Sequence, residues 1–234
     1  MHPDLEGLLA LQEQDRLVMS TQQRLDALAL VFQRLDEQLA MAERALEAAR
    51  RGIDDAQRRR NELEGKITNF KTMQEQRRQR LEWVRGAKEA ATLMAELDLT
   101  RSVLAKEEAE FMRSGDSVHE ALEKAEAAEQ AVAAVREGQA AEREVLRGKR
   151  EEILAEQEGR LTNREAAAKN VESSLLARYE RIRKGKAPLA LYALHGDACG
   201  RCFTAVPTQR RVLIQRGAAI EVCEACGVLL YAAE

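Results

Sequence analysis

Apolar residues recur at alternating steps of three and four along the first third of the chain, from Leu25 to Val84. Only Arg60, Gln74 and Arg77 place a long polar side chain at a position of this seam. A repeat of 3.5 residues sustained over this length is typical of a left-handed coiled coil rather than of a helix on a globular core. Together with a shorter apolar stripe before Leu25, the pattern predicts one helix of about 80 residues.

A second seam of the same kind begins at Leu93 and reaches Ile182 with local slips in phase. Between the two seams, residues 85–88 break the repeat, and Gly86 can adopt the positive φ that ends a helix. Alanine occupies many positions of the second seam, so this helix buries less area per contact. Four glycines weaken it further, each by roughly 1 kcal/mol against alanine; they are Gly115, Gly138, Gly148 and Gly159. The glycine and proline of residues 185–188 are expected to end the helix.

Charge favours folding the two helices back on each other as an antiparallel hairpin. Residues 57–88 hold ten Lys or Arg against four Asp or Glu, a balance of +6. Residues 89–129 hold eleven Asp or Glu against four Lys or Arg, a balance of −7. A turn at Gly86 lays these segments side by side, where flanking pairs help to set helix orientation. The alternative is a parallel homodimer of uninterrupted helices, which would place like charges together; the sequence leaves the oligomeric state open.

The composition changes after Pro188, where short apolar and β-branched runs replace the helical repeat. Four runs are predicted to be extended, at residues 189–194, 211–215, 219–222 and 227–231. His195-Gly196-Asp197 and Arg216-Gly217 are predicted to form the turns between them. The sequence thus predicts two domains, a helical hairpin over residues 1–186 and a small β lobe over residues 187–234.

All four cysteines lie in this lobe, at Cys199, Cys202, Cys223 and Cys226. Two Cys-x-x-Cys pairs can bring four thiolates to one tetrahedral Zn²⁺. Fewer than 50 residues bury little core, so we expect one structural Zn²⁺ per chain to hold the lobe together. The predicted fold class is therefore mainly α, a long antiparallel coiled-coil hairpin followed by a small β zinc ribbon. The alternatives are two disulfides or a redox dithiol, and His195 is a competing ligand.

Composition and apolar runs indicate the class of protein and the compartment in which we expect it. Charged residues make up 33% of the chain and aromatic residues 3%, which is typical of long helices. The N-terminus lacks the basic and apolar regions of a signal peptide, and no apolar run approaches the ~20 residues that cross a bilayer. We expect a cytoplasmic protein without membrane insertion, in which the cysteines are reduced. The formal net charge of −3 offers no general attraction for nucleic acid.

We expect no enzymatic activity, because the four thiols fill a closed metal shell and no Gly-x-x-x-x-Gly-Lys-[Ser/Thr] phosphate loop occurs. A basic cluster before and within the ribbon is a second candidate site, for phosphates or for a protein partner. Its members are Arg178, Tyr179, Arg181, Arg183, Lys184, Lys186, Arg210 and Arg211. Tyr179 or Phe203 could stack on a base. The alternative is a solvated helix end, where basic residues suit the helix dipole.

Four segments carry a resemblance to a known family. They are residues 8–12 with Asp15, residues 87–89 with Leu93 and Glu96, residues 179–183, and residues 223–231 with Pro207. Through them, and over nearly its whole length, the chain resembles the bacterial C4-type zinc-ribbon family, a coiled-coil hairpin with a C-terminal ribbon. It departs from the family at Ala90, where an aromatic residue is usual, and at Phe203, where glycine is common.

The resemblance implies a non-enzymatic adaptor, associated in some bacteria with alternative sigma factors and with flagellar or type III export machinery. Binding of RNA or DNA has also been supposed for the family. The acidic residues of the ribbon and the two negative charges of a four-thiolate zinc centre weigh against nucleic acid. We therefore rank protein partners, of unknown identity, ahead of nucleic acid.

Overall fold

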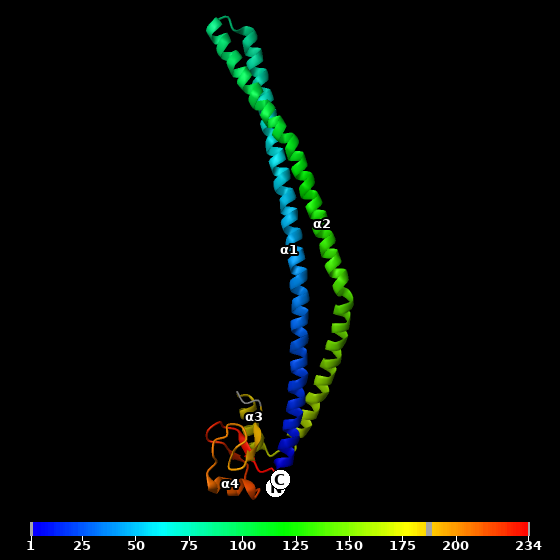
Figure 1. Ribbon diagram of the computed structural model, residues 1–234, viewed down its shortest axis with the longest axis vertical. Coiled ribbons are helices and arrows are strands. Elements are labelled where there is room, and N and C mark those ends of the chain that lie inside the picture. Colours follow the sequence, from blue (N-terminus) through cyan, green and yellow to red (C-terminus); the bar gives the residue numbers. More distant parts are fainter. Residues whose placement is uncertain (1, 186–188, 234) are drawn as a thin grey trace. The chain divides into compact units, whose positions relative to one another are not determined.

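The computed structural model describes residues 2–185 and 189–233 of the chain (Figure 1). In order, the elements are α1 (Leu5–Trp83), α2 (Ala87–Ala168), α3 (Ser173–Arg183), β1 (Leu191–His195), β2 (Ala198–Cys199), α4 (Thr208–Gln215), β3 (Glu221–Val222) and β4 (Leu229–Tyr231). Contacts group them into two compact units. The hairpin unit is Phe32–Arg143, and the base unit is Met1–Val31 with Glu144–Glu234. Over the described range, no helix has an apolar stretch that would let it cross a membrane.

In the hairpin unit, α1 and α2 run antiparallel and are joined by residues 84–86. Buried apolar side chains from both helices form the seam; they are Leu35, Leu63, Ile67, Leu93, Leu97, Leu104, Ala125 and Val132. Ion pairs beside the seam join the basic part of α1 to the acidic part of α2. These are Lys66–Glu107, Lys71–Glu108 and Arg77–Glu96, with N–O distances of 3.8, 2.9 and 3.1 Å. The predicted antiparallel hairpin is confirmed, and its connection overlaps the turn expected at 85–88.

Two of the polar residues that interrupt the first seam have specific partners on α2. The Arg60 guanidinium carbon lies 4.4 Å from the ring centroid of Phe111, a cation–π contact. Gly115 leaves room for it, because a Cβ there would lie 2.8 Å from Arg60 Nη1. Arg77 donates a hydrogen bond to the Thr100 hydroxyl. Polar seam contacts of this kind favour one register of the two helices over others.

The second seam, expected to continue to Ile182 as one helix, is broken. Helix α2 ends at Ala168, and α3 begins at Ser173 after an extended residue, Glu172 (φ −57°, ψ 138°). The Glu172 carboxylate accepts hydrogen bonds from the backbone N–H groups of Ser174 and Leu175, both at 3.0 Å, and so caps α3. This cap starts a new helix in a new direction, although the apolar spacing itself would have allowed the old one to continue.

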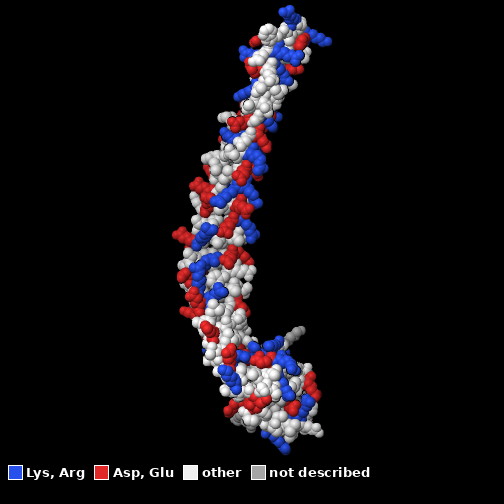
Figure 2. Space-filling view, turned by 180° about the vertical axis from the view of Figure 1, so that it is seen from behind, with Lys and Arg blue, Asp and Glu red and all other residues white. Residues whose placement is uncertain are grey.

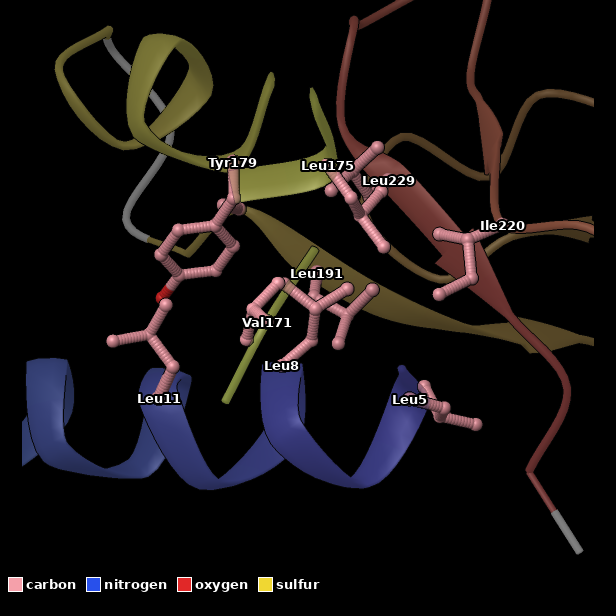
Figure 3. Close-up of a cluster of buried hydrophobic side chains, with 10 residues drawn as sticks. Leu5, Leu8, Leu11, Val171, Leu175, Tyr179, Leu191, Ile220 and Leu229 are labelled. Carbon is pink, nitrogen blue, oxygen red and sulfur yellow. The ribbon is translucent and has the colours of Figure 1, made fainter. Parts of the chain in front are cut away.

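The core of the base unit combines the first turns of α1 with the C-terminal part of the chain (Figure 3). Its buried members are Leu5, Leu8, Leu11, Val171, Leu175, Tyr179, Ala190, Leu191, Ile220 and Leu229. Leu8 and Leu11 point from α1 toward α3 and the strands in Figure 3. The domain boundary expected at 186/187 falls among the residues outside the described ranges and stays a prediction.

The strands form one small sheet in the order β2-β1-β4-β3. The central pair is parallel, with Leu191 opposite Leu229, and both outer pairs are antiparallel. Gly196, with φ 62°, makes the tight turn between β1 and β2 that the sequence predicted. The sheet carries the first cysteine at the end of β2 and leads into the third just after β3.

The predicted strand at 211–215 is wrong, because these residues belong to helix α4. Pro207 precedes the helix with φ −53° and ψ 137°, a conformation suited to an N-cap. The Gly217 N–H bonds to the Ile214 carbonyl and the Ala218 N–H to the Leu213 carbonyl, both at 3.0 Å. With φ 68° at Gly217, this is a Schellman C-cap. Arg216-Gly217 therefore ends a helix instead of turning a hairpin.

Candidate metal centre

The four cysteines converge on one point of the base unit. Their Sγ atoms all lie within 4.8 Å of one another, and Cys199 and Cys223 are buried. The Cys199–Cys226 and Cys202–Cys223 Sγ–Sγ distances are both 3.7 Å. A tetrahedral ion with bonds of about 2.3 Å to sulfur requires sulfurs about 3.8 Å apart, so the four thiols fit the donor set and the spacing of a structural Zn²⁺ site. Each of these two pairs joins one Cys-x-x-Cys segment to the other, at a distance too long for a disulfide.

Each Cys-x-x-Cys segment folds into the same tight turn. The Phe203 N–H bonds to the Cys199 carbonyl at 2.9 Å, and the Gly227 N–H bonds to the Cys223 carbonyl at 2.7 Å. Both closing residues have positive φ, 57° at Phe203 and 75° at Gly227. The turn thus places each pair of thiols on one side of the backbone. In the first turn, a non-glycine residue adopts the left-handed conformation that glycine adopts in the second.

The first turn also packs tightly against β1. A Cβ at Gly200 would lie 2.3 Å from the Ala193 carbonyl oxygen, so only glycine fits there without backbone movement. The Arg201 N–H points at Cys199 Sγ from 3.4 Å, and the Arg201 guanidinium donates to the Cys226 carbonyl at 3.2 Å. Apolar side chains, among them Ile214 and Val228, form a buried cluster with Cys199 and Cys223.

The thiols differ in acidity because their surroundings differ. Hydrogen bonding with Thr204 lowers the pKa of Cys202 to about 6. Burial raises the pKa of Cys199 and raises the pKa of Cys226 to about 12. Metal binding requires thiolates, so a cation would offset the cost of ionising the buried thiols. His195 is exposed, with its ring edge-on to Phe203 at 6.1 Å, and is not among the converging side chains.

The predicted basic cluster does not form one surface of free cations. Arg183 pairs with Asp15 at 3.5 Å and Glu180 at 3.1 Å. Arg210 pairs with Glu224 at 3.0 Å, and Arg211 with Asp197 at 3.4 Å. The remaining described cations are exposed; they are Arg178, Arg181 and Lys184. Lys186 lies outside the described residues.

Tyr179, assigned to the same cluster, lies in the core of the base unit. It is 1% exposed, so its ring is inaccessible for stacking on a base. Its hydroxyl donates to Asp15 Oδ2 at 2.7 Å. Burial, together with this hydrogen bond to a carboxylate, raises the pKa of Tyr179. Figure 3 shows the ring spanning from α3 toward α1.

Sequence reasoning missed the polar network around Tyr179. Arg164 of α2 donates to Asp15 Oδ1 at 3.0 Å and also contacts the Glu180 carboxylate. Burial alone would raise the pKa of Glu180, but hydrogen bonds from Arg164 and Arg183 hold it below its ordinary value. Asp15 therefore joins α1, α2 and α3 through one buried carboxylate.

A second polar contact ties α1 to the sheet. The Gln12 side chain donates to the Leu191 carbonyl at 2.9 Å and accepts from the Leu191 N–H at 2.8 Å. Gln12 and Asp15 lie on the same helix face as Leu8, a spacing of three and four residues. That spacing was the signal in the sequence for polar side chains that hydrogen-bond within the core. It lies in one of the segments that carry the family resemblance.

Comparisons with known proteins bear on the fold. Residues 11–187 match the family model described as the CT398-like coiled coil hairpin domain. Among solved structures, the HP0958 protein from Helicobacter pylori aligns with TM-score 0.70 and 14% identity over 99% of each chain. CT398 from Chlamydia trachomatis aligns with TM-score 0.61 and 19% identity over 98% of this chain and 97% of its own. A protein from Mycobacterium smegmatis aligns with TM-score 0.64 and 19% identity over 100% of both. No curated protein sequence matches.

Proposed function

The chain belongs to the CT398-like coiled coil hairpin domain family, and from that premise we propose that it is a non-enzymatic, zinc-binding adaptor that engages protein partners. The convergence of four thiols within 4.8 Å carries the zinc part of this proposal. Zn²⁺ is the ion that four cysteine sulfurs in a tetrahedron favour, and one ion per chain would be bound. Its role would be structural, with an apparent ~10–16 kcal/mol available at pH 7 to stabilise the lobe.

Four protein ligands leave no coordination position for a substrate or water, which supports an adaptor rather than a metalloenzyme. The long helices offer extended surface, which suits protein binding. The partners that the family resemblance implies are alternative sigma factors and components of flagellar or type III export machinery, and they are the first candidates to test.

Nucleic-acid binding is the competing proposal, and the charge pairing weighs against it. Arg183, Arg210 and Arg211 each have an acidic partner within 4 Å. Phosphate contacts would have to displace these carboxylates. Of the described members of the cluster, Arg178, Arg181 and Lys184 then remain to release counterions from a nucleic acid.

Metal content of the purified protein tests the zinc proposal. We expect one Zn²⁺ per chain, lost in Cys223→Ser while the helical circular dichroism of the long helices persists. Val222→Ser is the matched control, because it changes the neighbouring residue without removing a sulfur, and it should keep the metal. Stoichiometric zinc in Cys223→Ser would contradict the assignment.

The salt dependence of RNA and DNA binding distinguishes a protein-binding adaptor from a nucleic-acid-binding protein. We expect only weak binding to mixed-sequence RNA and DNA at 200 mM salt, little changed by Arg181→Gln with Lys184→Gln. Affinity purification from the native host after nuclease treatment should recover a stoichiometric protein partner. Sub-micromolar RNA or DNA binding at 200 mM salt, abolished by the double change, would overturn the ranking.

A further inference from the structure

The only tryptophan of the chain stands at the closed end of the hairpin unit. Trp83 is the last residue of α1 and is 84% exposed. Tryptophan is usually well buried in folded proteins, because its large apolar surface is costly to hydrate. Its neighbours Leu81 and Val84 are half-buried, so the exposed indole is not needed for the seam. This side chain therefore contributes little to the fold that holds it.

The same end of the unit is basic, although the chain as a whole is acidic. Residues 78–89 carry four Lys or Arg against two Glu, a balance of +2, where the chain has −3. Arg80 is paired with Glu89 at 3.1 Å. Within the described ranges, the other three cations have no acidic partner within 4.0 Å; they are Arg78, Arg85 and Lys88, and all are exposed. Figure 2 shows basic side chains projecting where the two helices join, at the top of the picture.

Tryptophan and arginine are the residues most enriched among those that dominate binding energy at protein interfaces. A single protruding indole fits a pocket that excludes water, and the free cations of residues 78–89 favour an acidic rim on the partner. Glu82 is exposed next to Trp83, so a uniformly negative surface, such as an anionic bilayer or a nucleic-acid backbone, would repel it. A protein surface can instead place its acidic residues opposite the free cations and leave Glu82 unopposed.

We propose that Trp83, with Arg78, Arg85 and Lys88, forms a docking site for an acidic protein surface that contains an apolar pocket. The assignment to a protein partner rests on the proposed adaptor role. It does not depend on zinc, because the residues belong to the hairpin unit and the cysteines to the base unit.

Photo-cross-linking in the native host tests the site in the full chain. The probe is p-benzoyl-L-phenylalanine in place of Trp83. The matched control carries the same probe in place of Met112, which is 73% exposed in the same unit but lies outside residues 78–89. We expect a discrete protein adduct at position 83 that is absent at position 112. Adduct formation should fall at least about tenfold when Arg85→Glu and Lys88→Glu are added, since like charges then face the acidic rim.

The captured protein is then identified by mass spectrometry, purified and titrated against the full chain labelled with 5-fluorotryptophan. Because Trp83 is the only tryptophan, one ¹⁹F resonance reports on the site, and we expect it to shift on binding. Trp83→Ala should weaken the affinity at least about tenfold, and Met112→Ala should leave it unchanged.

Cys223→Ser separates this proposal from the zinc proposal, since it should lose metal yet keep the ¹⁹F shift and the affinity. Four results would each overturn the docking site: no protein adduct at position 83, an adduct insensitive to the charge reversals, an adduct with lipid or nucleic acid alone, or unchanged affinity of Trp83→Ala.

Discussion

Replacing Asp15 by asparagine removes the one charge through which α1, α2 and α3 meet. The Asp15 side chain is 5% exposed and binds the Tyr179 hydroxyl on one oxygen and Arg164 on the other, at 2.7 and 3.0 Å. Asparagine has the same shape but only one acceptor oxygen, and its NH₂ group would face one of the two donors. We expect Asp15→Asn to loosen the docking of α3 without disturbing the hairpin unit.

The size of the effect follows from the burial of these groups. A hydrogen bond to a charged group contributes about 1.5–3 kcal/mol, and breaking a buried ion pair costs about 3–5 kcal/mol. Arg164 keeps its contact with Glu180, which reduces the second cost. A destabilisation of about 2–3 kcal/mol is therefore expected, equivalent to roughly 30- to 150-fold in the opening equilibrium of α3.

Hydrogen exchange of the α3 amides measures that opening directly, without assuming that the whole chain unfolds as one. Asp36→Asn is the matched control, because Asp36 pairs with Arg143 at 2.6 Å but is 65% exposed, and exposed pairs contribute about 1 kcal/mol or less. Tyr179→Phe should reproduce part of the effect and be less than additive with Asp15→Asn. Equal, small changes in α3 exchange for Asp15→Asn and Asp36→Asn would refute the reasoning.

Three further predictions concern the cap of α3, the first cysteine turn and the glycines of α2. Hydrogen bonds from the Ser174 hydroxyl and from backbone N–H groups lower the pKa of Glu172 to about 2, so its capping contribution is complete above pH 4.5 and is lost as the pH falls toward 2. Hydrogen exchange of the α3 amides should accelerate over that range. A Glu172→Gln variant with the same pH response would contradict this. Phe203→Gly should stabilise the zinc-loaded base unit by about 0.5–1 kcal/mol in thermal unfolding, because glycine adopts φ 57° without steric cost; a loss of stability would show that the ring contributes more than the strain costs. Gly148→Ala should raise helix stability by about 1 kcal/mol, since no atom lies within 4 Å of a Cβ there. Gly115→Ala should stabilise the helix less, because its Cβ would meet Arg60. Equal gains in the melting temperature would show that Arg60 moves freely.

The helices and their pairing were predictable because their signals are local. The 3.5-residue repeat predicts the two helices, and opposite charge on adjacent segments predicts their antiparallel order. The break at Glu172 was not predictable from spacing, since Val171 and Leu175 continue the helical pattern and only the cap redirects the chain. Helix α4 was missed because Val212 and Ile214 alternate as they would in a strand, while Pro207 and the Gly217 cap determine a helix.

The convergence of the four cysteines was predictable from spacing alone, because two Cys-x-x-Cys turns need little else to bring four thiols together. The basic cluster was not, since its charge partners come from distant segments. Arg183 meets Asp15 across 168 positions, and Arg211 of α4 meets Asp197 of the turn between β1 and β2. A run of cations in sequence predicts a charged surface only when the fold leaves those cations unpaired.

Residues from the start of the chain also support the C-terminal lobe, so a bound metal would not be its only support. The backbone N–H and carbonyl of Leu191, in the central pair of the sheet, are both satisfied by Gln12 of α1. Buried backbone groups without partners are costly, so this strand depends on a side chain from the start of the chain. Leu5, Leu8 and Leu11 supply the apolar surface that covers the same strands. Zinc would order the two cysteine turns, whereas the first helix supplies the core on which the sheet rests.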